Sequence, residues 1–172
     1  YGLYVLSMMQ SPQHTFGLLP SDEMVIMFQS LKGDTAQDVN YTRFKNLIEG
    51  SPYFMQHFPP NPRVKSELQF LQHNIFVRAF SGEDNDVIGQ NVFMGMIDEV
   101  NFMKVIQNSK KANGNEVYDQ AQAIYRAVRR RRQSRFMQSG GNLPGVLYLV
   151  SSKRYPGEFT ERKINEAQEE YE

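Results

Sequence analysis

Residues 92–99 read VFMGMIDE, an apolar run that ends in two adjacent carboxylates, Asp98 and Glu99. Continuous apolar runs of this kind are typical of strands buried on both faces of a parallel sheet, so we predict a strand over residues 91–97. Strand periodicity places the two acids on opposite faces. At the carboxyl end of a parallel strand, however, both can lean into the crevice where open α/β sheets bind their ligands.

The acid pair suits phosphate chemistry. Asp98 can hold Mg²⁺, directly or through water, and Glu99 can activate the water that attacks a γ-phosphate. This is the Walker B arrangement. The pattern alone leaves a second interpretation open, in which a capped strand end carries two solvated acids.

Other short apolar segments predict further strands. Buried strands are expected over residues 23–29 (EMVIMFQ) and 146–150 (VLYLV). Residues 68–72 and 75–80 alternate around His73-Asn74, which predicts a β-hairpin. These segments supply the strands of a sheet around residues 91–97.

Helical patterns lie between the strands. The first ten residues are apolar at nearly every position, which predicts a helix that is buried on most sides and ends at Ser11-Pro12. Further helices are predicted from Asp34 or Thr35 to about residue 49, over residues 117–137 up to Gly140-Gly141, and in the charged C-terminal segment. Residues 51–62 hold four prolines and are predicted to be a surface connection. This order predicts an α/β domain whose mainly parallel sheet is flanked by helices and carries an inserted β-hairpin.

The composition sets further limits. A chain of 172 residues with 40% hydrophobic residues predicts one globular domain over residues 1–172. No apolar run approaches the ~20 residues of a membrane span, so no membrane association is expected. The absence of cysteine excludes disulfides and thiolate nucleophiles. The formal net charge is zero, so any site for anions must be local.

Several segments, in order, resemble the central part of the ATPase domain of large terminase subunits from tailed bacteriophages. Gly89-Gln90-Asn91, the apolar strand and residues 98–102 (DEVNF) resemble that family's G-x-N, strand and DE-[AV]-N-F. Other matching segments are residues 11–13 (SPQ), 16–18 (FGL), 51–54 (SPYF), 132–136 (RQSRF) and the strand-end pair Ser151-Ser152. The resemblance covers essentially the whole chain.

This resemblance implies a P-loop NTPase-like fold of the RecA/ASCE type, with ATP and Mg²⁺ as cofactors. It implies that Asp98 holds the metal, that Glu99 is catalytic, and that Ser151 and Ser152 form the motif that senses the γ-phosphate. Without it, the two serines would be expected only to begin a turn. The intact protein would package viral double-stranded DNA into a procapsid in the host cytoplasm, as a homo-oligomeric ring with the portal and the small terminase subunit as partners.

Six arginines fall within the ten residues from Arg126 to Arg135. They are spread around the predicted helix, so most of them are expected to be solvated. In a ring motor, an arginine of the adjacent subunit can stabilise the charge on the transferring phosphate. Arg135, inside the S-R-F match, is the first candidate for this arginine finger, and Arg132 is the second.

A phosphate-binding loop of the form G-x-x-x-x-G-K-[ST] occurs nowhere in the sequence. The resemblance implies that residues 1–10 are the remainder of the helix that follows this loop, so that the ATPase domain is truncated at its N-terminus. It also implies that the nuclease domain lies beyond Glu172. We therefore expect the isolated chain to bind ATP poorly and to hydrolyse it negligibly, because positioning the β and γ phosphates supplies most of the catalysis.

Two other functions share some of these features. A helicase or another P-loop nucleic-acid motor would carry the same acid pair at its strand end. A non-catalytic α/β module could use the arginine-rich helix to bind phosphate backbones or a protein partner, independently of Asp98 and Glu99.

Overall fold

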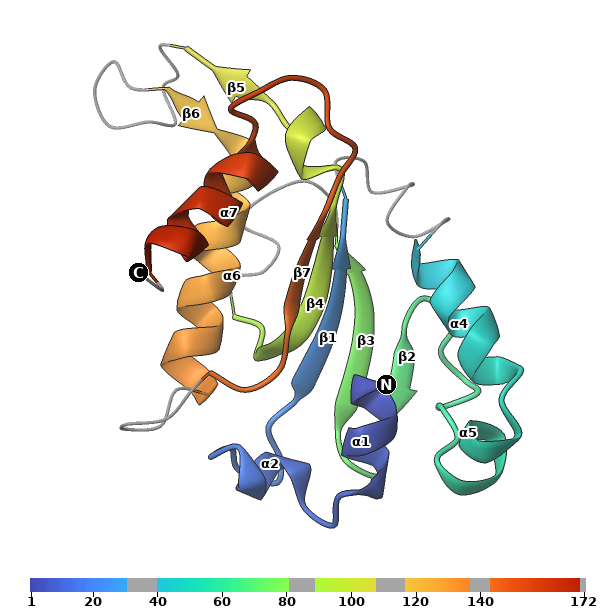
Figure 1. Ribbon diagram of the computed structural model, residues 1–172. Coiled ribbons are helices and arrows are strands. Elements are labelled where there is room, and N and C mark those ends of the chain that lie inside the picture. Colours follow the sequence, from blue (N-terminus) through green and yellow to red (C-terminus); the bar gives the residue numbers. More distant parts are fainter. Residues whose placement is uncertain (31–39, 81–88, 108–116, 137–142, 171–172) are drawn as a thin grey trace.

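The fold is built around a five-stranded sheet with the strand order β2-β3-β1-β4-β7 (Figure 1). A computed structural model describes residues 1–30, 40–80, 89–107, 117–136 and 143–170. The strands are β1 (Met24–Gln29), β2 (Leu68–Phe70), β3 (Ile75–Phe80), β4 (Val92–Asp98) and β7 (Leu147–Val150). β1 pairs in parallel with β3 and β4, β4 pairs in parallel with β7, and β2 is antiparallel to β3. The predicted, mainly parallel sheet is confirmed.

Helices lie on both sides of this sheet (Figure 1). Their bounds are α1 (Gly2–Met8), α2 (Pro12–Thr15), α4 (Thr42–Glu49), α5 (Pro52–His57), α6 (Gln120–Phe136) and α7 (Phe159–Glu169). A 3-10 turn, η3 (Val100–Phe102), follows β4, and β5 (Val105–Ile106) pairs with β6 (Tyr118–Asp119). Within the described ranges, no helix is both long enough and apolar enough to cross a membrane.

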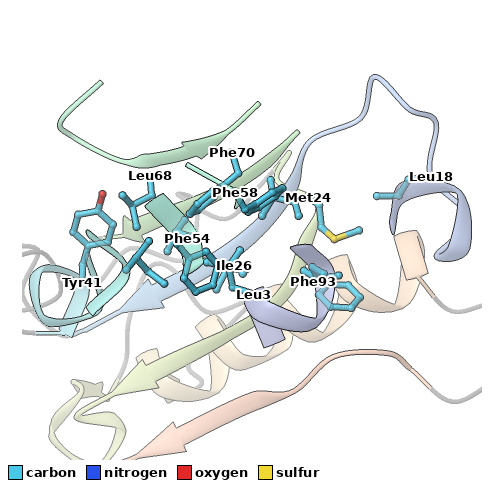
Figure 2. Close-up of a cluster of buried hydrophobic side chains, with 14 of the residues drawn as sticks. Leu3, Leu18, Met24, Ile26, Tyr41, Phe54, Phe58, Leu68, Phe70 and Phe93 are labelled. Atoms are coloured by element: carbon cyan, nitrogen blue, oxygen red, sulfur yellow. The ribbon is translucent and has the colours of Figure 1, made fainter. Parts of the chain in front are cut away.

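One face of the sheet is covered by α1, α5 and the segments around them (Figure 2). Leu3 and Leu6 of α1 are buried there beside Ile26 of β1. Phe58, which follows α5, stacks on Phe70 of β2 with their ring centroids 5.0 Å apart. Each fully buried side chain of this size stabilises the fold by about 1.5–3 kcal/mol.

The opposite face is covered by α6 and α7. Met27 of β1 and Ile97 of β4 are fully buried there against Ile124 of α6, and Phe159 of α7 belongs to the same cluster. Ile26 and Met27 are adjacent in β1, so their side chains point to opposite faces. The strand is therefore buried on both sides, as its continuous apolar run predicts.

The predicted hairpin is present, but its place in the sheet differs from the prediction. β2 and β3 are antiparallel and are joined through Asn74, whose φ is 49°. β3 also pairs in parallel with β1 over six residues, from Met24 opposite Ile75 to Gln29 opposite Phe80. One arm of the hairpin is thus an interior strand of the main sheet.

Two helical predictions were wrong. Residues 52–57, predicted to be a surface connection, form α5. Pro52 stands in its first turn, where a proline lacks only an N–H that would have no partner and its fixed φ favours a helix start. In α1, predicted to be buried on most sides, only Leu3 and Leu6 are buried, while Tyr4 and Met8 are exposed.

The last strand was also predicted incorrectly. Residues 146–150 were expected to be buried, but β7 is an edge strand of the described sheet and its burial alternates. Leu147 and Leu149 pack on the cluster beneath α6, whereas Tyr148 is 61% exposed and Val150 is 42% exposed. Only one face of β7 is covered.

The long arginine-bearing helix begins three residues later than predicted. It starts at Gln120, and Asp119 Oδ1 accepts a hydrogen bond of 3.0 Å from the Gln122 N–H of its first turn. This is the bond that an N-terminal capping residue makes. The predicted cap at Asp34 or Thr35 and the predicted stop at Gly140-Gly141 lie outside the described residues.

The approach of β4 to β1 requires a glycine at position 95. Gly95 lies opposite Met27 in the parallel register. A Cβ atom built on Gly95 would stand 2.2 Å from Met27 Cγ and 2.7 Å from the Met27 carbonyl oxygen. The carbonyl belongs to the strand backbone, so it cannot move aside without disturbing the pairing of β1 and β4.

We therefore predict that Gly95→Ala lowers the free energy of unfolding by about 1–3 kcal/mol through overpacking. Urea unfolding of the chain, compared with wild type at an unchanged m value, measures this loss. Gly50→Ala is the matched control, because Gly50 is exposed and its added Cβ would meet only the Asn46 carbonyl, at 3.1 Å. Equal stability of the two variants would contradict the steric argument.

Candidate functional site

Three parallel strands end side by side at one edge of the sheet. β1 ends at Gln29 and is followed by Ser30, β4 ends at Asp98 and is followed by Glu99, and β7 is followed by Ser151. The edge is at the top of the sheet in Figure 1. The structure thus brings together the strand-end residues that the sequence singled out, at the edge where ligands of open α/β sheets bind.

The carboxylate of Asp98 is held by two hydrogen bonds. Its Oδ1 accepts the backbone N–H of Glu99 at 2.8 Å, and its Oδ2 accepts Nδ2 of Asn40 at 2.7 Å. Each oxygen of an ionised carboxylate can accept more than one hydrogen bond. Asp98 is therefore fixed in orientation and still has lone pairs for a cation or a water molecule.

Glu99 has a left-handed backbone conformation, with φ 57° and ψ 30°. This conformation is uncommon for a residue with a side chain and is found most often in turns and at functional sites. Its Oε2 lies 3.5 Å from the Ser30 hydroxyl, at the end of β1. The turn therefore directs Glu99 along the crest of the sheet towards β1, and both acids are half-buried at the same edge.

Asn101 joins the turn after β4 to two other elements. Its backbone N–H donates to Ser151 Oγ at 3.1 Å, and its Nδ2 donates to the Ser152 carbonyl at 3.2 Å and to Thr160 Oγ1 at 2.9 Å. Its Oδ1 accepts the Thr160 N–H at 3.0 Å. We call this set of bonds the Asn101 clasp. It links the acid-bearing turn, the end of β7 and the first turn of α7.

Ser151 and Ser152 thus lie one contact away from the acid pair. Ser151 is half-buried and accepts through its hydroxyl, whereas Ser152 is exposed and takes part through its main chain. Asn101, Thr160, Ser30 and Asn40 were given no role in the prediction. Ser30 directly follows a strand, as Ser151 does, so the same sequence pattern could have identified it. The contact between Asn40 and Asp98 joins residues 58 positions apart, and no local pattern predicts it.

Arg132, the second candidate for the arginine finger, lies in a position that does not suit this role. Arg132 is only 6% exposed, and its guanidinium donates to the carbonyls of Phe93, at 3.2 Å, and Pro144, at 2.7 Å. Burial lowers its pKa from the ordinary value. A finger must reach the nucleotide of a neighbouring subunit, and this guanidinium is held inside the molecule.

Arg135 is exposed, at the far end of α6 from the acid pair. Phe136, its neighbour, packs on Phe93 at the amino end of β4, with ring centroids 5.4 Å apart. Phe93 and Asp98 are five residues apart, roughly 16 Å along a strand. Arg135 therefore does not lie at the acid pair of its own chain, and its role towards a neighbouring subunit stays a prediction.

The donor set at this edge fits one kind of metal site. No group of three or more His, Cys, Asp or Glu side chains that could hold a metal ion occurs in the part of the chain that the structure describes. Mg²⁺ is commonly bound by one or two carboxylates together with substrate phosphates and water. Asp98 can supply such a ligand, but a site made of protein ligands alone is not formed by the described residues.

The fold and sequence were compared with those of known proteins. The crystal structure of the HK97 bacteriophage large terminase superimposes with a TM-score of 0.56 at 13% sequence identity, covering 99% of this chain and 30% of the terminase chain. At this identity the likeness concerns the fold.

The comparison with curated proteins gave no match. A family model described as "Uncharacterized protein MJ0330, N-terminal P-loop domain" matches residues 1–171. The chain therefore has a P-loop NTPase-like α/β fold and belongs to the family of the MJ0330 N-terminal P-loop domain.

Proposed function

We propose that this chain is part of an ATP-hydrolysing motor of the large terminase type, which moves double-stranded DNA into a procapsid. The observation that carries the proposal is the position of Asp98 and Glu99, between Ser30 of β1 and Ser151 of β7. P-loop motors of this fold place their metal-binding and water-positioning acids at such strand ends. The ordered resemblance of the sequence to large terminase subunits supports the choice among motors.

In this proposal the two acids have different tasks. When Mg²⁺ is bound with ATP, it would supply positive charge against the charge that develops on the transferring phosphate. Asp98, held by Asn40 and the Glu99 N–H, would be a ligand to that ion or to its water. Glu99, directed along the crest by its left-handed backbone, would orient the attacking water and accept its proton.

The proposal needs a phosphate-binding loop from outside these 172 residues, because the sequence contains none. The chain spans 30% of the length of the HK97 terminase, so the activity of a whole motor is itself part of the proposal. The intact assembly would be a homo-oligomeric ring in the host cytoplasm, with the portal and the small terminase subunit as partners. Arg135 would act on the nucleotide of the adjacent subunit.

The central test replaces the proposed base. Glu99→Gln in the intact protein should lower ATP turnover by at least about 10²-fold, since general bases contribute roughly 10²–10⁴ to the rate. The dissociation constant for ATP should change little, because the amide preserves the shape of the side chain. Phosphate release and nucleotide titration measure the two quantities.

Glu169→Gln is the matched control for this test. Glu169 is an exposed residue of α7 and lies outside the strand-end site, so the same chemical change there should leave turnover at the wild-type level. Turnover that survives in Glu99→Gln would remove Glu99 from the proposed mechanism.

The Asn101 clasp offers a route from the acid turn to α7, and it can be tested separately. Asn101→Ala leaves the Thr160 N–H and the Ser152 carbonyl without their partner. We expect it to reduce the stimulation of ATP turnover by DNA while the affinity for ATP is kept. A structural effect alone would instead lower stability and leave the ratio of stimulated to basal turnover unchanged.

A double-mutant cycle with Thr160→Val measures the clasp itself. Residues in one hydrogen-bond network show coupling energies of about 0.5–3 kcal/mol. Additive losses of stability would show that Asn101 and Thr160 do not act together. Asn46→Ala, at an exposed position of α4, controls for the loss of an asparagine side chain.

A helicase is the alternative motor, and the acid pair does not distinguish it from a translocase. A DNA translocase of the packaging type should displace a protein roadblock from duplex DNA without separating the strands. A strand-displacement assay in the presence of ATP decides between them, because strand separation would identify a helicase.

A further inference from the structure

An open groove runs between α6 and α7, on the face of the sheet opposite to α1. It has a volume of about 560 Å³, and its charged lining residues are four cations and two carboxylates: Arg126, Arg129, Arg162, Lys163, Asp119 and Glu166. We call it the cationic groove. A neighbouring hollow shares Arg129, Lys163 and Glu166 with it and is also lined by Leu147 and Leu149 of β7, so this face of the molecule is open beyond the site of one small ion.

Both carboxylates of the groove are already paired. Arg162 Nη2 lies 2.6 Å from Asp119 Oδ2, and the Lys163 ammonium is hydrogen-bonded to the Glu166 carboxylate. The Lys163 hydrogen bond lowers the pKa of Glu166, so this acid stays ionised and stays paired. The repulsion that these acids would exert on an anionic ligand is therefore largely offset from within the groove.

Arg126 and Arg129 carry the charge that remains. Both are exposed, and within the described ranges neither lies at ion-pair distance from a carboxylate, although the charge of Arg129 adds to the effect of Lys163 on Glu166. They are three positions apart on α6, so they are neighbours on one side of the helix, and they line the same groove. The whole of α6 contains no acidic residue that could neutralise them.

Aromatic rings hold two of the four cations, Lys163 and Arg162, in place. Lys163 Nζ lies 4.8 Å from the centroid of the Tyr125 ring, and Arg162 lies over Phe159 at 5.5 Å. Tyr125 and Phe159 meet edge to face, 6.0 Å apart. Cations fixed by aromatic rings and ion pairs lose less side-chain freedom on binding a ligand than free surface lysines and arginines do.

The groove is adjacent to the candidate nucleotide site through two contacts. The first residue of α6, Gln120, donates its N–H to the Lys104 carbonyl in the segment that follows the acid turn, at 3.0 Å. Thr160, in the first turn of α7, is held by the Asn101 clasp. A displacement of the acid turn would therefore move both walls of the groove.

We infer that the cationic groove binds the phosphate backbone of duplex DNA, with Arg126 and Arg129 as its main phosphate contacts. An open groove whose lining carries two more cations than carboxylates fits a repeating polyanion, and guanidinium groups bind phosphate oxygens in a bidentate manner. The contacts are to the backbone, so binding is independent of base sequence and sensitive to salt. The choice of DNA as the polyanion rests on the proposed function.

The test compares two double variants of the intact protein that lose the same charge from the same helix. The first combines Arg126→Gln with Arg129→Gln inside the groove. The control combines Arg130→Gln with Arg131→Gln, which lie outside it. Fluorescence anisotropy with a labelled duplex of random sequence, without nucleotide and over a series of salt concentrations, gives the affinity and its salt dependence.

The groove variant should bind DNA about tenfold more weakly and should lower the slope of log affinity against log salt by about 2, which is the loss of two phosphate contacts. The control should keep a slope close to that of wild type. Circular dichroism and thermal unfolding confirm that both variants are folded, which is expected because the substituted side chains are exposed or half-buried.

Equal losses in the two variants would overturn the inference, because they would show attraction to the net charge of α6 alone. The inference would also be overturned if poly-glutamate competed for the groove as strongly as unlabelled DNA does, because the groove would then not select a nucleic acid. Failure of the proposed motor is a separate result. If the groove variant loses DNA binding and the wild-type protein hydrolyses no ATP, the inference about the groove stands and the proposed motor function is refuted. If the wild-type protein hydrolyses ATP and the groove variant binds DNA as wild type does, the motor function stands and the inference about the groove is refuted.

Discussion

The parallel pairing of β4 with β1 on one side and β7 on the other is the constraint on which the rest of the structure depends. The close approach of the two backbones at Met27 is favoured because Gly95 has no side chain there. Parallel strands share a direction, so this pairing places the residues after all three strands at one edge. For that reason Glu99 lies beside Ser30, which follows β1, and the turn after β4 is hydrogen-bonded to Ser151, which follows β7.

The two ends of β4 are held in different ways. At its amino end, Phe93 is skipped in the register between Val25–Val92 and Ile26–Met94, and its carbonyl accepts Nε of the buried Arg132. Gly145 packs so closely on the same carbonyl that a Cβ would stand 2.3 Å from it. At the carboxyl end, polar side chains replace this tight packing. The amino end is thus a rigid anchor, and the carboxyl end presents hydrogen-bonding groups.

Asn101 connects that edge to the rest of the molecule. Both hydrogens of its amide are donated and its oxygen accepts from Thr160, so a buried polar side chain is fully satisfied. Removing such a group costs more than one hydrogen bond, because its partners are left unpaired at a buried position. The clasp ties α7 to the turn that carries the acids, and α7 in turn forms one wall of the cationic groove.

The sequence by itself determined the strands at residues 24–29 and 92–98, the β-hairpin, the acid pair at a strand end and the lack of a phosphate-binding loop. These features depend on local patterns and chain direction, which a sequence displays directly.

Tertiary structure alone decided that α5 exists among four prolines, that β7 has one exposed face, and that Arg132 is buried while Arg126 and Arg129 line a groove. It also decided the partners of the acids, since Asn40 and Ser30 reach Asp98 and Glu99 across 58 and 69 residues. Periodicity reports which residues share a face of one element, but the rotation of that element and the neighbour that covers it are set by packing, which depends on every other element at once.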